Sequence, residues 1–434
     1  MKKIIYIFFL FMGSVFMGWT QTPVPAKPQE KPIALTGGTA HLGNGQVIEN
    51  AIIGFDKGKL TLVADASKEK PDLSGYEVID IKGKQVYPGF ILPNSQVGLS
   101  EVSSIRAMHD DTEQGELNPN VRSVIAYNTD SEFIPTFRFN GVLLAETTPT
   151  GGLISGTSSV MEMDGWNWED AVHTQDIGVH LNWPPRMKRQ FDLSTFTFAE
   201  TPNKDYDKQT GELQQLFDEA TGYGKLTTKE VNLKFEALQG LFDGKKTLFI
   251  HADDPKGIVE SIRFAQRNRV QHSTLLAGIG AYYVVDFLKE NKIPVILPTP
   301  HSLPARVDDE VDMPFKLPHL LTKAGIMVSL SNDDALHGSR NLGFFAGTAV
   351  AFGMEKEEAL KTITSNTAKA LGIDKRVGTL EVGKDATLFV SIGDALDYRT
   401  NQLVYAFISG KMITLPGNQQ ELFERFSRKY GQMK

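Results

Sequence analysis

The residues of this chain best suited to chemistry are a histidine and an aspartate that each follow a short apolar run. His251 comes directly after the run 247–250, and Asp333 comes shortly after the run 326–330. A neutral imidazole can bind Zn²⁺, and a carboxylate can bind a metal or take a proton from water as a general base. The plainer alternatives are a histidine hydrogen-bonded within the fold and an aspartate that caps a helix or turn. We take His251 and Asp333 as the leading candidates for a reaction centre.

Two further histidines are candidates for the wall of the same pocket. His180 lies inside a predicted strand, and His337 lies in the loop beyond Asp333. The chain has nine histidines and no cysteine, which excludes thiolate ligands and disulfides. A structural role suits both histidines as well, so the sequence leaves both alternatives open.

The elements that must position these residues alternate between apolar strands and amphipathic helices. Helical stretches include 257–266, 281–289 and 356–371. Eight strands that alternate with helices predict an α/β fold, the (β/α)8 TIM-like barrel, in which reacting groups lie at the carboxyl ends of the strands. The predicted strands are 89–92, 141–145, 153–161, 178–181, 247–250, 273–277, 293–297 and 326–330.

Two β-rich ends flank this middle part of the chain. Short strands broken by glycine turns predict the first part of a small composite β-sandwich at 32–87, and a similar texture predicts its second part, with a C-terminal tail, at 376–434. The barrel then occupies 88–375. Within it, the stretch 186–246 is longer than a barrel needs between two strands, and we expect a charged helical insertion that serves as a lid or an oligomer contact.

The N-terminus has the pattern of a secretory signal peptide. Lys2 and Lys3 precede the apolar run 4–16, which is shorter than the roughly 20 residues that a membrane-spanning helix needs. We therefore predict a signal peptide at 1–20, export, and a periplasmic or secreted location. The proline-rich, polar segment 21–31 is typical of an extended linker.

Composition narrows the class of partner. The 434 residues are 41% hydrophobic, enough for a sizeable core, and the formal net charge is −7. No basic cluster stands out in the sequence, so nucleic acid is not an expected partner.

Six short motifs carry a family resemblance over nearly the whole chain after the signal peptide. The last of them has the pattern G-x-L-x-x-G-K-D-A, which resembles the return of a known family to its small β domain. The chain resembles the amidohydrolase superfamily, in its imidazolonepropionase-like branch. The motifs are YPGFI at 87–91, NGV at 140–142, GGLISG at 151–156, NLGFFAG at 341–347, ALKTITSNTAK at 359–369 and GTLEVGKDA at 378–386.

The resemblance implies metal-assisted hydrolysis of carbon–nitrogen bonds in amides, cyclic amides or dipeptide-like substrates. It implies a bound metal, commonly Zn²⁺, held by a His-x-His after the first strand, histidines at the fifth and sixth strands and an aspartate at the eighth. His251 and Asp333 match the fifth and eighth positions. Asn94 and Gln96 stand at the two His-x-His positions, and the sixth position falls in 276–280, which has no histidine.

This departure weakens the expected metal site. A catalytic zinc site normally has three protein ligands, and the neutral amide oxygens of Asn94 and Gln96 are poor donors for that ion. His251 and Asp333 alone would make a weak site for one Zn²⁺, unless His180 or His337 supplies a third ligand. A binuclear centre is not expected.

Three functions stay open at this point. An active hydrolase of a small-molecule amide would use Asp333 as general base and His251 as a metal ligand or transition-state stabiliser. A catalytically inactive homologue would bind a small ligand, or would act as the partner subunit of an active relative in a homo- or hetero-oligomer. A metal-free hydrolase would use Asp333 and His251 as an acid–base pair.

Overall fold

The computed structural model describes residues 24–102, 104–193, 196–304, 309–333 and 335–433. The predicted signal peptide lies outside these residues, so its prediction is untested. Among the described residues, no helix has both the length and the apolar character needed to cross a membrane.

The middle of the chain forms a nearly closed barrel, and all eight predicted strands are confirmed. The strands follow one another around the sheet in chain order. The two end strands meet where the Ser331 hydroxyl donates a hydrogen bond to the Pro93 carbonyl at 2.6 Å. The strands are β6 (Phe90–Ser95), β7 (Val142–Thr147), β8 (Ile154–Glu162), β9 (Val172–Asn182), β12 (Thr247–His251), β13 (Ser273–Leu276), β14 (Val295–Leu297) and β15 (Val328–Leu330).

One strand departs from the regular (β/α)8 pattern. β8 is antiparallel to both β7 and β9, whereas the other neighbouring strands pair in parallel. Parallel neighbours need a crossover of a dozen or more residues, and the connection 148–153 is too short for one. Gly151 and Gly152 help this connection to turn, because they adopt φ of 83° and 62°, which favour glycine.

Several helices cover the outside of the barrel with an apolar face turned to its core, and α7 is an example. In α7 (Pro255–Arg267), Asp254 caps the first turn by accepting a hydrogen bond from the Gly257 amide, and Ile258 and Ile262 lie four residues apart on the buried face. The other helices are α2 (Ser123–Ala126), α3 (Phe133–Phe139), α4 (Trp168–Ala171), α5 (Tyr206–Gly224), α6 (Leu233–Phe242), α8 (Gly280–Tyr283), α9 (Val285–Glu290), α10 (Met313–Lys323), α11 (Leu342–Ala351), α12 (Lys356–Lys361), α13 (Ser365–Ala370) and α14 (Asn418–Lys429), with 3₁₀ helices η1 (Arg106–Met108) and η2 (Leu336–Asn341).

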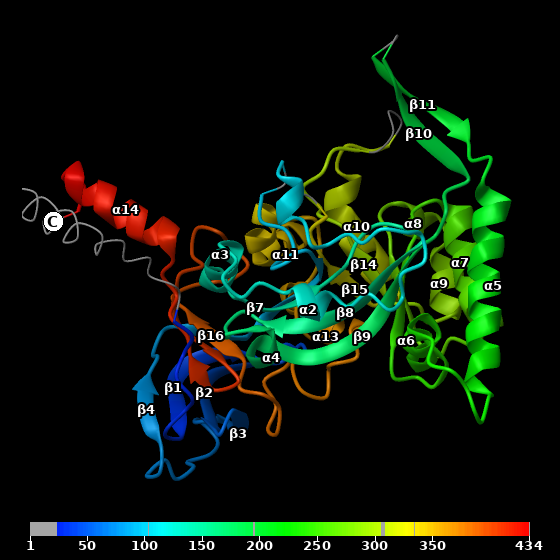
Figure 1. The fold of residues 1–434 in the computed structure, drawn as a ribbon. Coiled ribbons are helices and arrows are strands. Elements are labelled where there is room, and N and C mark those ends of the chain that lie inside the picture. The colour runs from blue at the N-terminus through cyan, green and yellow to red at the C-terminus, as the bar shows by residue number, and fades with distance from the viewer. Residues whose placement is uncertain (1–23, 103, 194–195, 305–308, 334, 434) are drawn as a thin grey trace, which may run out of the picture.

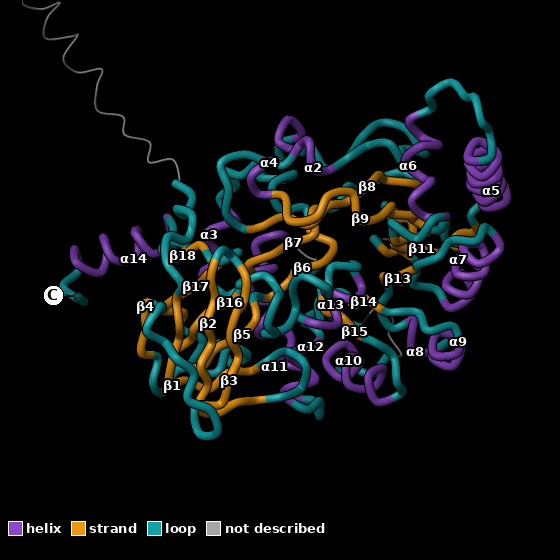
Figure 2. Tube along the Cα trace, turned by 90° about the horizontal axis from the view of Figure 1, so that it is seen from below, coloured by secondary structure: helices purple, strands orange, loops and turns teal. Residues whose placement is uncertain are grey.

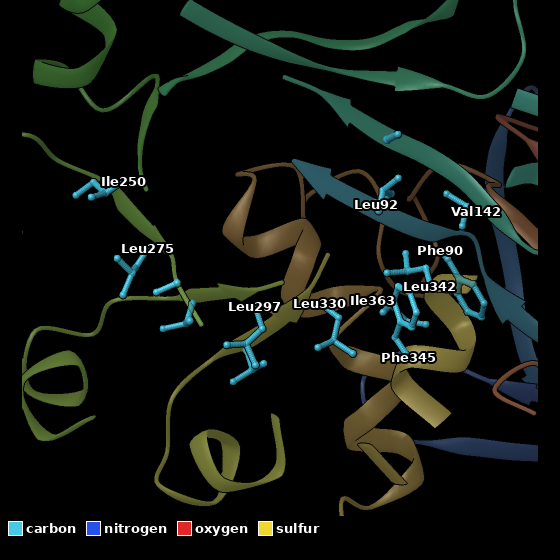
Figure 3. Packing of buried hydrophobic residues seen from close by; sticks show 14 of the residues in the cluster. Phe90, Leu92, Val142, Ile250, Leu275, Leu297, Leu330, Leu342, Phe345 and Ile363 are labelled. Atoms are coloured by element: carbon cyan, nitrogen blue, oxygen red, sulfur yellow. The ribbon is translucent and has the colours of Figure 1, made fainter. Parts of the chain in front are cut away.

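The barrel core is continuous from strand to strand. Figure 3 shows one buried side chain from each of four successive strands: Ile250, Leu275, Leu297 and Leu330. α11 packs so closely on β6 that a Cβ on its Gly343 would lie 2.9 Å from the Phe90 ring. This tight packing fixes the strand ends at which the candidate residues lie.

The stretch 186–246 is only partly helical. It begins with the hairpin of β10 (Met187–Asp192) and β11 (Thr197–Pro202), which projects beyond the barrel, and continues into α5 and α6 (Figure 1). The predicted helices are present as α5 and α6, whereas 187–202 forms strands, in which apolar residues such as Met187 and Phe191 do not alternate with polar ones. α14 likewise projects away from the body of the protein (Figures 1 and 2).

The two ends of the chain build one mixed sheet beside the barrel (Figure 2). The composite origin is confirmed, although all of these strands belong to a single hydrogen-bonded sheet rather than to two. The domain limits stay a prediction. The strands are β1 (Ile33–His41), β2 (Val47–Asp56), β3 (Lys59–Asp65), β4 (Glu77–Asp80), β5 (Gln85–Pro88), β16 (Leu388–Ser391), β17 (Leu403–Ile408) and β18 (Lys411–Met412).

A buried charge cluster ties this sheet to the barrel. Asp385, which precedes β16, accepts hydrogen bonds from His173 on β9 at 3.1 Å and from Arg376 at 2.9 Å. Lys59 on β3 forms an ion pair with the same carboxylate. The Asp385 side chain is 4% exposed, so a buried carboxylate joins the two parts of the molecule.

Candidate functional site

The site is built where neighbouring strands of the barrel bring His180 and His251 together. β9 and β12 pair in parallel, with Asn182 opposite His251 and His180 opposite Phe249. The His180 ring stacks on the Phe249 ring at a centroid distance of 4.7 Å. Its Nδ1 lies 2.9 Å from Nε2 of His251, which is the last residue of β12.

Behind this pair lies a carboxylate that is closed off from solvent. Glu146 on β7 and the His180 side chain are both 0% exposed, and Glu146 Oε1 lies 3.1 Å from His180 Nε2. The Ser158 hydroxyl donates to Glu146 Oε1 at 2.7 Å, and the Asn94 amide donates to Oε2 at 2.9 Å. Both carboxylate oxygens of Glu146 therefore have hydrogen-bond partners, as buried polar groups in proteins usually do.

The hydrogen bonds constrain where the protons lie. Because Ser158 gives its only proton to Glu146, it can only accept from His180 Nε2, 2.9 Å away. His180 Nε2 therefore carries a proton, and the shared proton between His180 Nδ1 and His251 Nε2 can sit on either ring. When a further proton enters at Nδ1 of His251, Nε2 can pass its own proton to His180, so Nδ1 changes from acceptor to donor without any movement of a side chain.

Burial and the neighbouring His180 lower the pKa of His251 to about 3. The cause is that the desolvated ring is poorly placed to hold a positive charge. His180, by contrast, faces the Glu146 carboxylate. Glu146, His180 and His251 thus form a proton relay that ends at the barrel mouth.

A cavity of about 220 Å³ opens at that end of the barrel. His251, Asn94 and Asp333 all line it, together with Asp253 and Ser331. These residues follow or end different strands, because the carboxyl ends of parallel strands meet on one side of a barrel. The predicted pair, His251 and Asp333, therefore shares one pocket.

Two contacts orient the opposite wall of this pocket. The Thr299 amide donates to Asp333 Oδ1 at 3.0 Å, which fixes the carboxylate and leaves its second oxygen for other partners. Asn94 adopts a left-handed backbone with φ of 52°, a conformation in which asparagine is enriched. The hydrogen bond that its backbone N–H donates to Glu146 couples this turn to the relay.

The other predicted residues lie differently. His180 belongs to the relay but does not line the cavity. Gln96 is half-buried and His337 is exposed on η2, and neither lines the cavity. The expectation that His337 overhangs the pocket thus finds no support, because η2 carries its side chain into solvent.

Sequence reasoning missed three residues of this site. Glu146 was overlooked because it lies inside the apolar strand β7, and Ser158 because it lies among other serine and threonine residues of the buried strand β8. A single carboxylate in an otherwise uncharged buried strand was the available signal, since such a group needs partners. Asp253 lies two residues after His251 and was available by the same strand-end argument.

Comparison with known proteins places this architecture in a family. The amidohydrolase family profile matches residues 235–413. An imidazolonepropionase from Bacillus cereus is 24% identical over 385 residues, which cover 81% of this chain and 84% of that protein. A 5-methylthioadenosine/S-adenosylhomocysteine deaminase from Thermoanaerobacter pseudethanolicus is 25% identical over 383 residues, covering 79% and 81%.

Solved structures agree at the level of the fold. An amidohydrolase from Thermotoga maritima has a TM-score of 0.75 at 22% identity, covering 88% of this chain and 99% of that one. A putative prolidase from Bifidobacterium longum has a TM-score of 0.56 at 16% identity, covering 93% and 100%. Residues 235–413 thus match the amidohydrolase family, and the chain as a whole has the fold of a solved amidohydrolase. It is distantly homologous to imidazolonepropionase.

The donor groups at this site do not fit the metal that amidohydrolases commonly bind. Among the residues that the structure describes, no group of three or more histidine, cysteine, aspartate or glutamate side chains is placed to hold one ion. Nε2 of His251 is hydrogen-bonded to His180, and Asn94 occupies a position at which a histidine ligand was expected. A zinc site with three protein ligands is therefore not formed by these residues.

Proposed function

We propose that this protein hydrolyses a carbon–nitrogen bond of a small amide by acid–base chemistry of its own side chains. The observation that carries the proposal is the relay of Glu146, His180 and His251, which ends in a pocket also lined by Asp333. A charged carboxylate is costly to bury, so a buried relay of this kind indicates a function. That function would be to place a proton donor and acceptor, His251, at the wall of the pocket.

In the proposed reaction the Asp333 carboxylate takes a proton from water, and the water oxygen forms a bond with the amide carbon. His251 Nδ1 donates a proton to the leaving nitrogen as the carbon–nitrogen bond breaks. His251 regains that proton at Nε2 from His180, which returns to its neutral form beside Glu146. The proton on Asp333 then passes through solvent to the relay, so all protons balance.

The Asn94 side chain completes this arrangement as a hydrogen-bond donor. It lines the same cavity, and an asparagine amide can stabilise the oxyanion that develops on the attacked carbonyl. Removing one such donor typically costs roughly 10²–10³-fold in kcat. This role explains why a polar residue suits a position at which relatives would place a metal ligand.

The test is hydrolysis of a panel of primary amides and anilides by the purified protein, followed as release of ammonia or aniline. We expect turnover that survives a chelator, and a fall in kcat/KM of at least about 10²-fold in Asp333→Asn and in His251→Asn. His337→Ala is the matched control, because this exposed histidine lies outside the cavity lining. Turnover that disappears with chelator, or that both variants retain, would contradict the proposal.

A second function is favoured by one observation, the lack of a three-ligand group among the described residues. If the chemistry has been lost with the metal, the pocket would serve as a ligand-binding site in an inactive partner of an active relative. Binding without any turnover across the panel, together with co-purification of a relative that carries His-x-His, would support this function instead.

The N-terminal pattern supports export as part of the proposal. Lys2, Lys3 and the apolar run 4–16 have the layout of a signal peptide. Expression in a Gram-negative host followed by cell fractionation and N-terminal sequencing tests this. We expect a mature protein that begins near Gln21 in the periplasmic fraction, whereas an uncleaved protein in the cytosol would contradict export.

A further inference from the structure

The helix α14 (Asn418–Lys429) projects from the body of the protein and carries an exposed apolar face (Figures 1 and 2). The side chains of Phe423, Phe426 and Tyr430 are 66%, 45% and 68% exposed. They lie three and four residues apart, so they share one side of the helix and its C-terminal cap. α14 also lies beyond residue 413, where the match to the amidohydrolase family profile ends. The face therefore belongs neither to the matched part of the chain nor to the cavity lined by His251.

The base of α14 is fixed on the protein body, whereas the rest of the helix extends away from it. Leu415 packs against the barrel core, and Gly417 lies so close to Pro135 of α3 that a Cβ on this glycine would be 2.7 Å away. The Gly417 N–H donates to the Gln420 side chain at 3.0 Å, which closes the first turn. A helix of 12 residues without tertiary packing is only marginally stable in water. Packing of its apolar face against a partner would stabilise it.

The charges of α14 are separated along its length. Glu421 and Glu424 lie in the first half, and Arg425, Arg428 and Lys429 lie in the second half. Glu424 pairs with Arg428 within the helix at 3.1 Å. Among the described residues, neither Glu421 nor Lys429 forms an ion pair. Two copies of such a helix attract each other when they lie antiparallel, because each acidic half then faces a basic half.

We propose that two copies of this chain pair through α14, with the two helices antiparallel about a two-fold axis near Phe426. This axis places Phe426 against the same residue of the second copy and Phe423 beside the second copy's Tyr430. Glu421 of each copy then lies near Lys429 of the other, so each dimer contains this ion pair twice. The interface is closed by its symmetry and forms a dimer rather than a chain of subunits. The proposal goes beyond the proposed function and stands on different residues.

A lipid surface is the other partner that suits a helix with aromatic and basic residues. Helices that lie in a membrane interface carry lysine and arginine along their polar face. In α14, Glu421 and Glu424 occupy the first half, where they would be repelled by an anionic surface. An antiparallel pair uses the separation of charge into two halves, whereas lipid binding does not. The observations thus favour a second copy of the chain.

The test is sedimentation equilibrium of the purified protein. Because the contact is one helix about 18 Å long, we expect a weak dimer with a Kd on the order of 10 µM. Phe426→Ser should raise this Kd at least about tenfold, since it removes the central aromatic contact. A protein that stays monomeric up to about 0.2 mM, some twenty times the expected Kd, would overturn the proposal.

The matched control lies on the other projecting part of the molecule. Leu193, at the end of the β10–β11 hairpin, is 76% exposed, so Leu193→Ser removes a comparable apolar side chain from a different surface. We expect the Kd of this variant to stay within about twofold of that of the unsubstituted protein. A dimer that is lost in Leu193→Ser and kept in Phe426→Ser would assign the interface to the hairpin and overturn the role of α14.

Charge reversal tests the antiparallel arrangement. Glu421→Lys would bring lysines together at both ion pairs, and Lys429→Glu would bring glutamates together, so each variant alone should dimerise about tenfold more weakly. An equal mixture of the two variants should recover a Kd within about threefold of the original, because opposite charges again face each other at both contacts. Any weakening of the helix itself persists in the mixture, so recovery reports pairing. A mixture no stronger than its components would overturn the arrangement.

Single cysteines test where the two-fold axis lies, because the chain has no cysteine of its own. Under mild oxidation Phe426→Cys should form a disulfide-linked dimer, since the axis passes close to this residue. Phe423→Cys should not, because the helical rise separates its two copies by about 9 Å, beyond the roughly 7 Å between Cα atoms that a disulfide spans. Equal cross-linking at both positions would overturn an axis near Phe426.

Flotation with vesicles that contain anionic phosphatidylglycerol distinguishes the two partners. We expect the protein to remain in solution, with its sedimentation unchanged by the vesicles. A monomer that floats with the vesicles, and no longer does so in Phe426→Ser, would assign the face to a lipid surface and overturn the dimer. Amide hydrolysis by such a monomer would leave the proposed function standing, whereas a dimer without hydrolysis would remove that function and keep this inference.

Discussion

Strand β9 carries two buried pairs of histidine and carboxylate, and their surroundings give them different roles. Near one end of the strand His173 pairs with Asp385 at 3.1 Å, and near the other end His180 pairs with Glu146, also at 3.1 Å. Both histidine side chains are 0% exposed. The two pairs are alike in chemistry and burial, so their differing third partners decide what each can do.

The third partners of Asp385 are cations. Although burial opposes it, hydrogen bonds from His173 and Lys59 and the charge of Arg376 lower the pKa of this carboxyl to about 2. The third partner of the other pair is the imidazole of His251, which reaches the cavity. Cations close the first pair into a fixed joint, whereas a second imidazole extends the other pair into a path for a proton.

The largest expected effect separates the two pairs by activity. Glu146→Gln keeps the shape of the relay but removes the charge that stabilises a proton on His180, and we expect kcat/KM to fall by about 10²–10³-fold. The melting temperature of the variant, measured in parallel, should change far less than its activity. The matched variant Asp385→Asn should keep kcat/KM within about threefold, and a large loss there would erase the distinction.

The second-largest expected effect distinguishes the two pairs by their contribution to the stability of the fold. Asp385→Asn leaves the Lys59 and Arg376 cations and His173 without their shared carboxylate, and we expect the free energy of unfolding to fall by about 2 kcal/mol. This loss of unfolding free energy is smaller than that expected for a fully buried ion pair, because the side chains of Lys59 and Arg376 are about half exposed. Urea unfolding followed by circular dichroism measures it, and an unchanged midpoint would show that the joint contributes nothing to stability.

Lowering the pH should have a smaller effect, on the contribution of Asp385 to the free energy of unfolding. The pKa of Asp385 lies near 2 in the folded protein and near 4 when unfolded, so its contribution is complete above about pH 4 and is lost as the pH falls through about 2. After allowance for solvent screening we expect this contribution to be about 1 kcal/mol. Unfolding free energies measured between pH 5 and pH 2 should fall less steeply in Asp385→Asn, and parallel curves for the two proteins would contradict this.

The smallest expected effect is that of zinc. The described residues form no three-ligand group, so we expect far less than one zinc per chain by inductively coupled plasma mass spectrometry and a melting temperature shifted by no more than about 1 °C on addition of zinc or a chelator. Near one zinc per chain, lost in His251→Ala, would instead indicate that His251 serves a metal site rather than a relay.

Much of the fold could be predicted because its signals are local. Apolar runs and helical periodicity identified all eight barrel strands, and the composite sheet followed from glycine-broken strands at both ends. The strand pattern does not indicate the reversed direction of β8. That direction follows from the connection 148–153, because its six residues are too few for a crossover between parallel strands. The hairpin β10–β11 was missed because apolar and polar residues do not alternate in its two short strands.

The sequence by itself determined the barrel and the strand-end positions of His251 and Asp333, because alternation and strand order are encoded by neighbouring residues. Only the tertiary structure decided that Glu146, His180 and His251 form one line, since their contacts join residues 34 and 71 positions apart. It also decided that Asp253 lines the same cavity as His251 and Asp333. The physical reason is that hydrogen bonds and shared cavities depend on which strands become neighbours, and chain order does not specify where each side chain meets the next.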